Sequence, residues 1–339
     1  MHIPDGYLSP QTYAPAYGIM IPLWALASAK LKKTLRARRV PMLALGAAFS
    51  FVIMMFNIPI PGGTTGHAVG SVLIAILLGP WAAMVAVSLA LIVQALIFGD
   101  GGITAIGANC FNMAVVMPFV GWGVYRLIAG SAPVNSKRHS IGAAIAGYIG
   151  LNAAALTTAF MFGIQPLIAT DAAGHALYSP FPLKVAVPIM ALEHLLIFGF
   201  VEAIVTGLVV AYMQRVEPDL LSVGARKTNN AYIRKLAIGI ALLILLSPLG
   251  LYLPAKFAAG SAWGEWSSDE IGKIAGYVPH GLKNLSSIWH APMPDYALHG
   301  QEPASLWSAS ISYILSAVIG VAVLAAVTIG LRKILSRRQ

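Results

Sequence analysis

The sequence predicts an all-α fold, and more specifically a polytopic helical membrane protein. Hydrophobic residues make up 58% of the 339 residues and charged residues 10%, so the chain has more apolar surface than one soluble core can bury. Several apolar runs exceed the ~18 residues that indicate a membrane span. The Lys and Arg residues, which give a net charge of +10, lie in short clusters beside these runs. We therefore expect the basic residues to orient the chain in a lipid bilayer and not to bind nucleic acid.

Nine helical segments are expected from eight apolar runs, because the third run is too long for one span. A helix over 66–98 would be about 50 Å long at ~1.5 Å per residue, against a hydrocarbon core of ~30 Å. Gly79-Pro80 falls inside this run and breaks it, since proline lacks the N–H that a helix interior needs. The expected segments are 12–29, 41–60, 66–78, 80–98, 104–128, 140–164, 184–213, 234–254 and 305–331.

The distribution of charge supports this count and predicts an orientation. With the N-terminus outside, nine segments place 18 of the 22 Lys and Arg residues on the inner side. Cytoplasmic loops carry an excess of basic residues, so the N-terminus is expected outside and the C-terminus in the cytosol.

The chain is expected to have two parts. Residues 1–215 form a seven-segment bundle, a cytosolic linker covers 216–233, and 234–333 form a two-span hairpin around an outer region, 255–304. The outer region is rich in Trp and Tyr, namely Trp263, Trp266, Tyr277, Trp289 and Tyr296. These aromatic residues either hold the region against the lipid headgroups or mark it as a lid or gate over the first part.

The opening "MHIPDGY" is suited to binding a metal ion. It has no basic start of the kind that begins a secretory signal, and the large His2 side chain is expected to leave Met1 in place. The Met1 amine, the His2 amide nitrogen and the His2 Nδ1 can close fused five- and six-membered chelate rings. Three nitrogens in one plane suit nickel(II) or copper(II).

His67 is the candidate for a fourth nitrogen. It lies in "NIPIPGGTTGHAVG", on the same expected outer side as the N-terminus, behind a Pro- and Gly-rich loop that can bend toward it. We therefore predict that Met1, His2 and His67 meet in one metal site.

Three stretches resemble the CbiM/NikM family, the substrate-binding components of energy-coupling-factor transporters for cobalt and nickel. They are "MHIPDGYLSPQTYAPAYG", "PGGTTGHAVGSVLIAILLGPWAA" and "GDGGITAIGANCFNMAVV", and the likeness covers about 1–215. In that family the metal is held by the N-terminal amine, the amide and imidazole of the second residue, and a histidine after the second span. These positions fall on Met1, His2 and His67.

The hairpin, with "GYVPHGL" and "APMPDYAL", resembles the small CbiN/NikN auxiliary component fused in line. The resemblance implies a bacterial or archaeal inner-membrane protein without a resident cofactor, whose transported ligand is the metal. It also implies ATPase subunits and a transmembrane coupling protein as partners. The hairpin is expected to add no metal ligand of its own.

Other polar residues in the apolar runs have two interpretations each. His194 and Glu202 are about 80° apart on an ideal helix and can line the bundle interior together, either as a functional pair or as a packing pair, whereas Glu193 and Glu202 are about 180° apart and cannot. Asn109 and Asn112 are expected to bond between helices, and they can also support the "GDGGITAIG" loop over the metal site.

The remaining histidines are not expected to be ligands. His175, His280, His290 and His299 are scattered over the outer side, and His139 stands among cytosolic basic residues, where we expect it to be solvated.

The predicted function is uptake of nickel, preferred over cobalt because four planar nitrogens favour nickel(II). The sequence has no GxxxxGK[ST] phosphate loop, so separate ATPases must supply the energy. The rival function is a secondary permease driven by protons or sodium, for which Glu193 and Glu202 are the available intramembrane acids. An intramembrane metalloenzyme is disfavoured because "EH" at 193–194 is not part of an HExxH motif.

Overall fold

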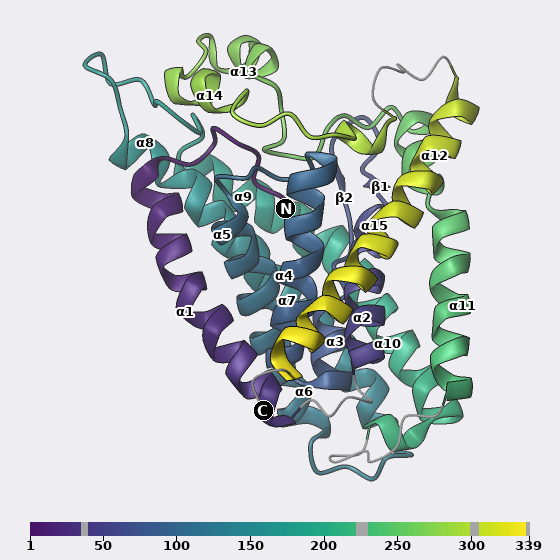
Figure 1. Ribbon diagram of the computed structural model, residues 1–339. Coiled ribbons are helices and arrows are strands. Elements are labelled where there is room, and N and C mark those ends of the chain that lie inside the picture. Colours follow the sequence, from purple (N-terminus) through teal and green to yellow (C-terminus); the bar gives the residue numbers. More distant parts are fainter. Residues whose placement is uncertain (35–39, 222–229, 299–304, 337–339) are drawn as a thin grey trace.

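The protein is described by a computed structural model that covers residues 1–339 except for 35–39, 222–229, 299–304 and 337–339 (Figure 1). Nearly every described element is helical, and one short antiparallel sheet pairs β1 with β2. The structure thus confirms the all-α fold class.

The long helices run along the bundle, and shorter elements connect them. The main helices are α1 (Pro10–Thr34), α2 (Val40–Met54), α3 (Ser71–Leu78), α4 (Pro80–Val93), α6 (Met117–Ala129), α7 (Arg138–Gly163), α9 (Leu183–Glu193), α10 (Gly199–Val216), α11 (Asn230–Leu246), α12 (Leu249–Lys256) and α15 (Leu306–Ser336). The shorter elements are β1 (Ile58–Pro59), β2 (Thr65–Gly66), α5 (Ile106–Asn109), α8 (Gln165–Ile168), α13 (Ser268–Ala275), α14 (His280–Leu285) and the 3-10 turns η5 (Pro218–Leu221) and η6 (Pro294–Tyr296). Three π-helical segments are η2 (Gln94–Phe98), η3 (Cys110–Val116) and η4 (His194–Phe198).

Six helical segments among the described residues are long and apolar enough to cross a membrane. They are Pro80–Phe98, Ile106–Ala129, Arg138–Ile168, Leu183–Val216, Ala231–Lys256 and Leu306–Gly330. The other three expected segments correspond to α1, α2 and the short α3. The protein is therefore a multi-pass membrane protein.

The predicted break at Gly79 is present. Helix α3 ends at Leu78, Gly79 has φ 90° and ψ 156°, and Pro80 begins α4. Proline suits this first helical position because its fixed φ fits the helix and its missing N–H would have no partner there. The break leaves α3 as a short helix whose first five residues are all buried, packed among α4, α6 and α7.

Small residues allow the central helices to approach closely. A Cβ at Gly150 of α7 would lie 2.7 Å from a methyl carbon of Val72 in α3, and a Cβ at Gly207 of α10 would lie 2.9 Å from Ala144 in α7. Lipid gives helices no hydrophobic reason to associate, so such close packing is a main source of stability in a bilayer. The bundle is thus tight around α7 and α3.

The region between α12 and α15, residues 257–298, is called the cap here. Figure 1 shows the cap, with α13 and α14, over the end of the bundle that holds the N-terminus. Tyr7 Oη donates to the main-chain oxygen of Trp266 at 2.7 Å, and Trp289 Nε1 donates to that of Leu96 at 3.0 Å. The cap aromatics therefore contact the N-terminal part, which favours the lid interpretation. Of the expected linker, 216–233, residues 222–229 lie outside the described residues, and its last part already belongs to α11, which begins at Asn230.

Candidate metal centre

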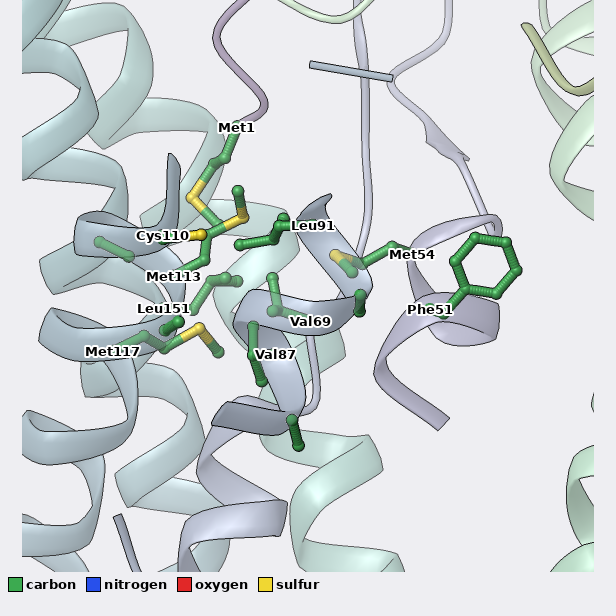
Figure 2. Close-up of a cluster of buried hydrophobic side chains, with 14 of the residues drawn as sticks. Met1, Phe51, Met54, Val69, Val87, Leu91, Cys110, Met113, Met117 and Leu151 are labelled. Atoms are coloured by element: carbon green, nitrogen blue, oxygen red, sulfur yellow. The ribbon is translucent and has the colours of Figure 1, made fainter. Parts of the chain in front are cut away.

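The N-terminus is anchored inside the bundle by apolar side chains. Met1 is 7% exposed and Ile3 is fully buried. Figure 2 shows the Met1 side chain reaching into a cluster that contains Cys110 and Met113. Burying a Met and an Ile side chain stabilises each by about 1.5–3 kcal/mol, so the first three residues are held in place although they form no helix.

Polar contacts fix the main chain of this segment. The side-chain amide of Asn109 accepts from the Ile3 nitrogen at 2.9 Å and donates to the Ile3 oxygen at 3.1 Å. The nitrogen of Gly102 donates to the same oxygen at 2.8 Å. A Cβ on Gly102 would lie 2.3 Å from the nitrogen of Asp5, so only glycine fits there. Asn109 and the glycine-rich loop therefore determine where the chain start lies.

His2 is held by a carboxylate. Its Nδ1 lies 2.9 Å from Oδ1 of Asp100, whose other oxygen accepts from Gln94 Nε2 at 3.1 Å and from the hydroxyl of Tyr296. Burial alone would raise the pKa of Asp100. The nearby His2, through its charge and its hydrogen bond, and the hydrogen bond from Tyr296 lower this pKa by more, so the pKa of Asp100 lies well below its ordinary value. The His2 ring is 3% exposed and its Nε2 has no hydrogen-bond partner.

His67 follows β2 directly, and its ring is also fixed at one nitrogen. Its Nδ1 lies 3.1 Å from the main-chain oxygen of Ala68, and because a carbonyl only accepts, the Nδ1 carries the proton. Burial, together with the nearby Met1 amine and His2, holds the pKa of His67 well below its ordinary value. The ring is therefore neutral at physiological pH, and its buried Nε2 is an unpartnered lone pair.

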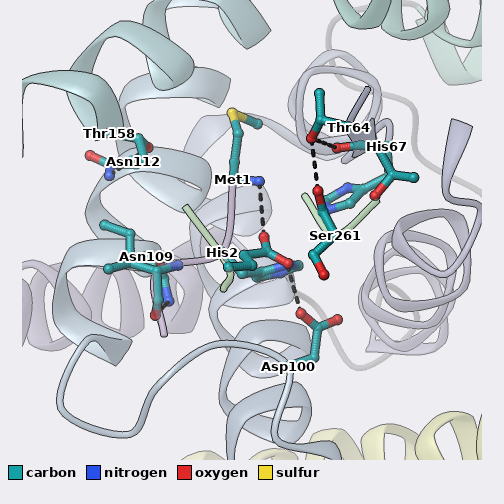
Figure 3. A network of polar contacts seen from close by, with 12 residues as sticks. Met1, His2, Thr64, His67, Asp100, Asn109, Asn112, Thr158 and Ser261 are labelled. Carbon is teal, nitrogen blue, oxygen red and sulfur yellow. Dashed lines mark hydrogen bonds and ion pairs between the residues drawn. The ribbon is translucent and has the colours of Figure 1, made fainter. Parts of the chain in front are cut away.

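The two imidazoles face each other beside the N-terminal amine (Figure 3). Their centroids are 5.0 Å apart and their planes are inclined by 31°. Buried polar atoms normally have partners, so two unpartnered ring nitrogens in one place call for a ligand that accepts their lone pairs. No group of three or more His, Cys, Asp or Glu in the described part of the chain is arranged to hold a metal ion. Main-chain nitrogens would have to contribute, as the predicted chelate requires.

The structure places Met1, His2 and His67 together, but one atom differs from the prediction. The chelate uses Nδ1 of His2, and the structure directs this nitrogen to Asp100. Chelation through Nδ1 therefore requires the ring to leave the carboxylate. The ligand roles of the three residues remain a prediction.

The cap contributes an acid that we did not expect. Glu265 Oε1 lies 3.6 Å from the Met1 amine, and the Glu265 side chain is 26% exposed. Burial raises the pKa of Glu265 and outweighs the lowering effect of the amine. A cap carboxylate thus reaches the first residue, whereas the prediction that the hairpin adds no metal ligand of its own stays a prediction.

The polar residues of the spans have separate partners. Asn112 donates to Thr158 Oγ1 at 2.9 Å, the expected bond between helices. His194 Nδ1 lies 2.8 Å from the oxygen of Met190 and 3.5 Å from Oε1 of Glu193. Glu202 instead accepts from main-chain nitrogens near His67.

The prediction that Glu193 and Glu202 cannot both face the interior is wrong. Glu193 is 8% exposed, His194 3%, and Glu202 is fully buried. The π-helical segment η4 begins at His194, directly after Glu193, and a π turn contains more residues than an α turn. The angles of an ideal α-helix therefore do not apply across this stretch.

The remaining histidines that the structure describes lie apart from this cluster. His175 and His280 are exposed and contact Asp171 and Asn284 respectively, and His290 is exposed. His299 lies outside the described residues. His139 is buried, not solvated as expected.

The burial of His139 has a simple cause. Its Nδ1 lies 2.7 Å from the hydroxyl of Tyr125 and its Nε2 lies 3.2 Å from the oxygen of Ala132. A neutral ring with both nitrogens paired can be buried at low cost, whatever charges precede it in the sequence.

Sequence reasoning missed Asp100, Gln94, Tyr296 and Glu265. Asp100 stands at the end of an apolar run and before two glycines, and an acid at such a position on the expected outer side could have been recognised. The others gave no local sign, since Tyr296 lies 202 residues from Gln94 along the chain.

Two family models match the chain. One, described as cobalt uptake substrate-specific transmembrane region, covers residues 2–220, and the PDGLE domain covers 234–337. The fused nickel transport protein NikMN of Rhodobacter capsulatus is 49% identical over 99% of both chains. The probable fused nickel transport protein LarMN of Lactiplantibacillus plantarum is 43% identical over 95% of this chain and 94% of its own length.

A solved structure of a transition metal transporter superposes with a TM-score of 0.60 at 53% identity, covering 64% of this chain and 93% of that one. The chain is thus a nickel or cobalt transport component rather than an enzyme, and it belongs to the CbiM family of cobalt uptake substrate-specific transmembrane regions, fused to a C-terminal PDGLE domain of CbiN type.

Proposed function

We propose that this chain is the substrate-binding component of an energy-coupling-factor importer that captures nickel(II), in preference to cobalt(II), at the outer face. The proposed ligands are the Met1 amine, the amide nitrogen and imidazole of His2, and the imidazole of His67. The observation that carries the proposal is that two buried imidazoles face each other beside the N-terminal amine, with the Nε2 of His67 unpartnered. The two relatives named above as nickel transport proteins support the choice of metal.

The charges around the site suit a dication. Four nitrogen donors give a strong planar field, which favours nickel(II) over cobalt(II). When the His2 ring turns to offer Nδ1 to the metal, the carboxylate of Asp100 is released but stays beside the site. Asp100 and Glu265 together can then balance two positive charges that would be costly to bury alone.

The basic clusters support the proposed orientation, with the N-terminus outside and the C-terminus in the cytosol. Lys30 lies near the last residues of α1, Arg215 near the last residues of α10 and Lys235 near the first residues of α11. Figure 1 shows these three helix ends on the side of the bundle opposite the cap. The transmembrane coupling protein and the ATPases would be separate subunits. On α1, Ala25 and Ala29 are exposed and one turn apart, so a partner helix can approach closely there.

One added residue tests the site directly. An extra Gly before Met1 converts the amine ligand into a peptide nitrogen, so one nickel per chain should bind in the wild type and none with comparable affinity in the extended chain. Calorimetry on the full chain in detergent measures this, and the same Gly added after Gln339 is the control. Native affinity in the extended chain would rule out the chelate.

A transport assay distinguishes the importer from the rival secondary permease. In proteoliposomes, uptake that requires the ATPase and coupling subunits with ATP supports the importer. Uptake by this chain alone, driven by a proton or sodium gradient, would favour the permease instead.

A further inference from the structure

A chain of hydrogen bonds connects His67 to a buried carboxylate on another helix. The Nδ1 of His67 donates to the oxygen of Ala68 at 3.1 Å, and the nitrogen of Val69 donates to Oε2 of Glu202 at 2.8 Å. The Ala68 oxygen and the Val69 N–H are opposite ends of one trans peptide group. The carboxylate, the peptide and the imidazole are therefore in series.

The carboxylate of Glu202 accepts hydrogen bonds from the main chain of this loop. It is fully buried in α10, and both of its oxygens lie 3.1 Å from the nitrogen of Gly70, the residue that precedes α3. The hydroxyl of Thr206 adds a longer contact of 3.4 Å. A buried carboxylate is expensive unless hydrogen-bonded, and here main-chain N–H groups near the start of a helix offset that expense.

We propose that Glu202 is a positioning residue of the metal site, which acts on His67 through the peptide between Ala68 and Val69. Hydrogen bonds in series polarise one another, so a carboxylate on the Val69 N–H makes the Ala68 oxygen a stronger acceptor. This keeps the proton on Nδ1, fixes the ring plane and leaves the Nε2 lone pair for the metal. The inference rests on the proposed function, in which His67 is a ligand.

In this structure the His2 ring, like the His67 ring, is connected to a carboxylate. Metal-binding histidines commonly donate their second N–H to a carboxylate or a main-chain oxygen. His2 contacts its carboxylate, Asp100, directly at 2.9 Å, and His67 reaches Glu202 through one peptide group. Before metal binding, each imidazole is thus held by one acid, and only the contact of His67 with Glu202 leaves its proposed ligand atom, Nε2, free for the metal.

The loop is held from a second side, so removal of the Glu202 charge need not unfold it. Ser50 of α2 donates to the Val69 oxygen at 2.8 Å, and a Cβ on Gly66 would lie 2.6 Å from the Phe198 ring. Glu202→Gln has the same shape and keeps one acceptor oxygen, but its NH₂ group opposes the loop N–H groups.

The test is a double-mutant cycle on the full chain in detergent, with nickel affinity measured by calorimetry. Glu202→Gln should weaken nickel binding about 10- to 100-fold while one ion per chain still binds. In a His67→Ala background, the same change should have no further effect on affinity, because the residue through which Glu202 acts is gone. Tyr125→Phe, which breaks a buried hydrogen bond near the opposite end of the bundle, is the control for a general loss of packing.

A second readout does not depend on the metal. The ¹⁵N shifts of the His67 ring should report a single Nδ1–H tautomer in the metal-free wild type and a mixture of tautomers in Glu202→Gln. If Glu202→Gln does not fold, Glu202→Asp replaces it in the test. This substitution keeps the charge but moves the carboxylate back by one methylene, so nickel affinity should also fall, but by less than in Glu202→Gln.

Three results would overturn the inference. They are wild-type affinity in the folded Glu202 variant, an equal loss in the His67→Ala background, and an unchanged tautomer. Failure of the proposed function looks different, because the wild type itself would then bind no nickel.

Discussion

The N-terminal bundle and the cap contribute different chemistry to the same place. The bundle and its loops provide every nitrogen donor of the proposed site, from Met1, His2 and His67. The cap provides oxygen: the Glu265 carboxylate beside the amine and the Tyr296 hydroxyl on Asp100. Nitrogen donors fix affinity and geometry, whereas the oxygen groups adjust charge and orientation. The two parts should therefore respond differently to mutation.

The largest effects are expected in the bundle. His2→Ala removes the central imidazole and should reduce nickel affinity by about 1,000-fold or more, while His67→Ala leaves the chelate of the first two residues and should cost about 100-fold. The two losses correspond to about 2.7 kcal/mol for 100-fold and about 4.1 kcal/mol for 1,000-fold, close to the ~2.5–4 kcal/mol that each of four ligands contributes when metal binding is worth about 10–16 kcal/mol. Calorimetry on both variants measures which one loses more nickel affinity, and His280→Ala, at an exposed histidine, is the control.

Equal affinities in His67→Ala and the wild type would remove His67 from the site and leave the bundle with three nitrogens. A smaller loss in His2→Ala than in His67→Ala would contradict the chelate.

Removing everything after Arg215, the cap included, should have an intermediate effect on binding and a large one on transport. A chain that ends at Arg215 keeps all the nitrogen donors, so it should still bind one nickel ion, about tenfold more weakly without the cap carboxylate and the Tyr296 bond to Asp100. Together with the proposed ATPase and coupling subunits, it should accumulate little metal in cells. Both quantities are measured on the same truncated protein.

Two outcomes would break the contrast between the regions. Complete loss of binding in a folded truncated protein would mean that the cap supplies an essential ligand. Undiminished uptake would mean that the hairpin has no role in transport.

The sequence predicted those features that depend on neighbouring residues. Helix positions follow from apolar runs, and the break at Gly79 follows from glycine and proline chemistry. The proposed chelate of Met1 with His2 is also local, and it stays a prediction. The approach of His67 to the N-terminus could also be predicted, because both lie on one side of the expected topology and because the family resemblance pairs them.

The remaining features depend on tertiary packing that no local pattern encodes. Glu265 and Tyr296 reach the site from the far end of the chain. Glu193 faces the interior because η4 departs from the 3.6-residue period, and π-helical segments of this kind often occur at functional sites. His139 is buried by Tyr125 and a main-chain oxygen, although the charges around it suggest solvent.

The smallest expected effect concerns one charge of the cap. Glu265 lies 3.6 Å from the Met1 amine, a distance that allows an ion pair but exceeds a normal hydrogen bond, and its side chain is 26% exposed. Glu265→Gln preserves shape and removes the charge. Because solvent screens a partly exposed group, nickel affinity should fall only by about three- to tenfold, without a change in stoichiometry.

Asp269→Asn is the matched control, since Asp269 is an exposed acid in the same cap and the substitution removes the same charge from a side chain that faces solvent. Calorimetry at low and at high salt distinguishes the effects of the two substitutions on nickel affinity. The loss in Glu265→Gln should persist in high salt, because its carboxylate lies 3.6 Å from the amine. Any effect of Asp269→Asn should fall as salt is added, because salt screens the interactions of solvent-exposed charges. Equal effects of the two substitutions would mean that the cap acts through its overall charge, and the Glu265 contact with Met1 would then have no special role.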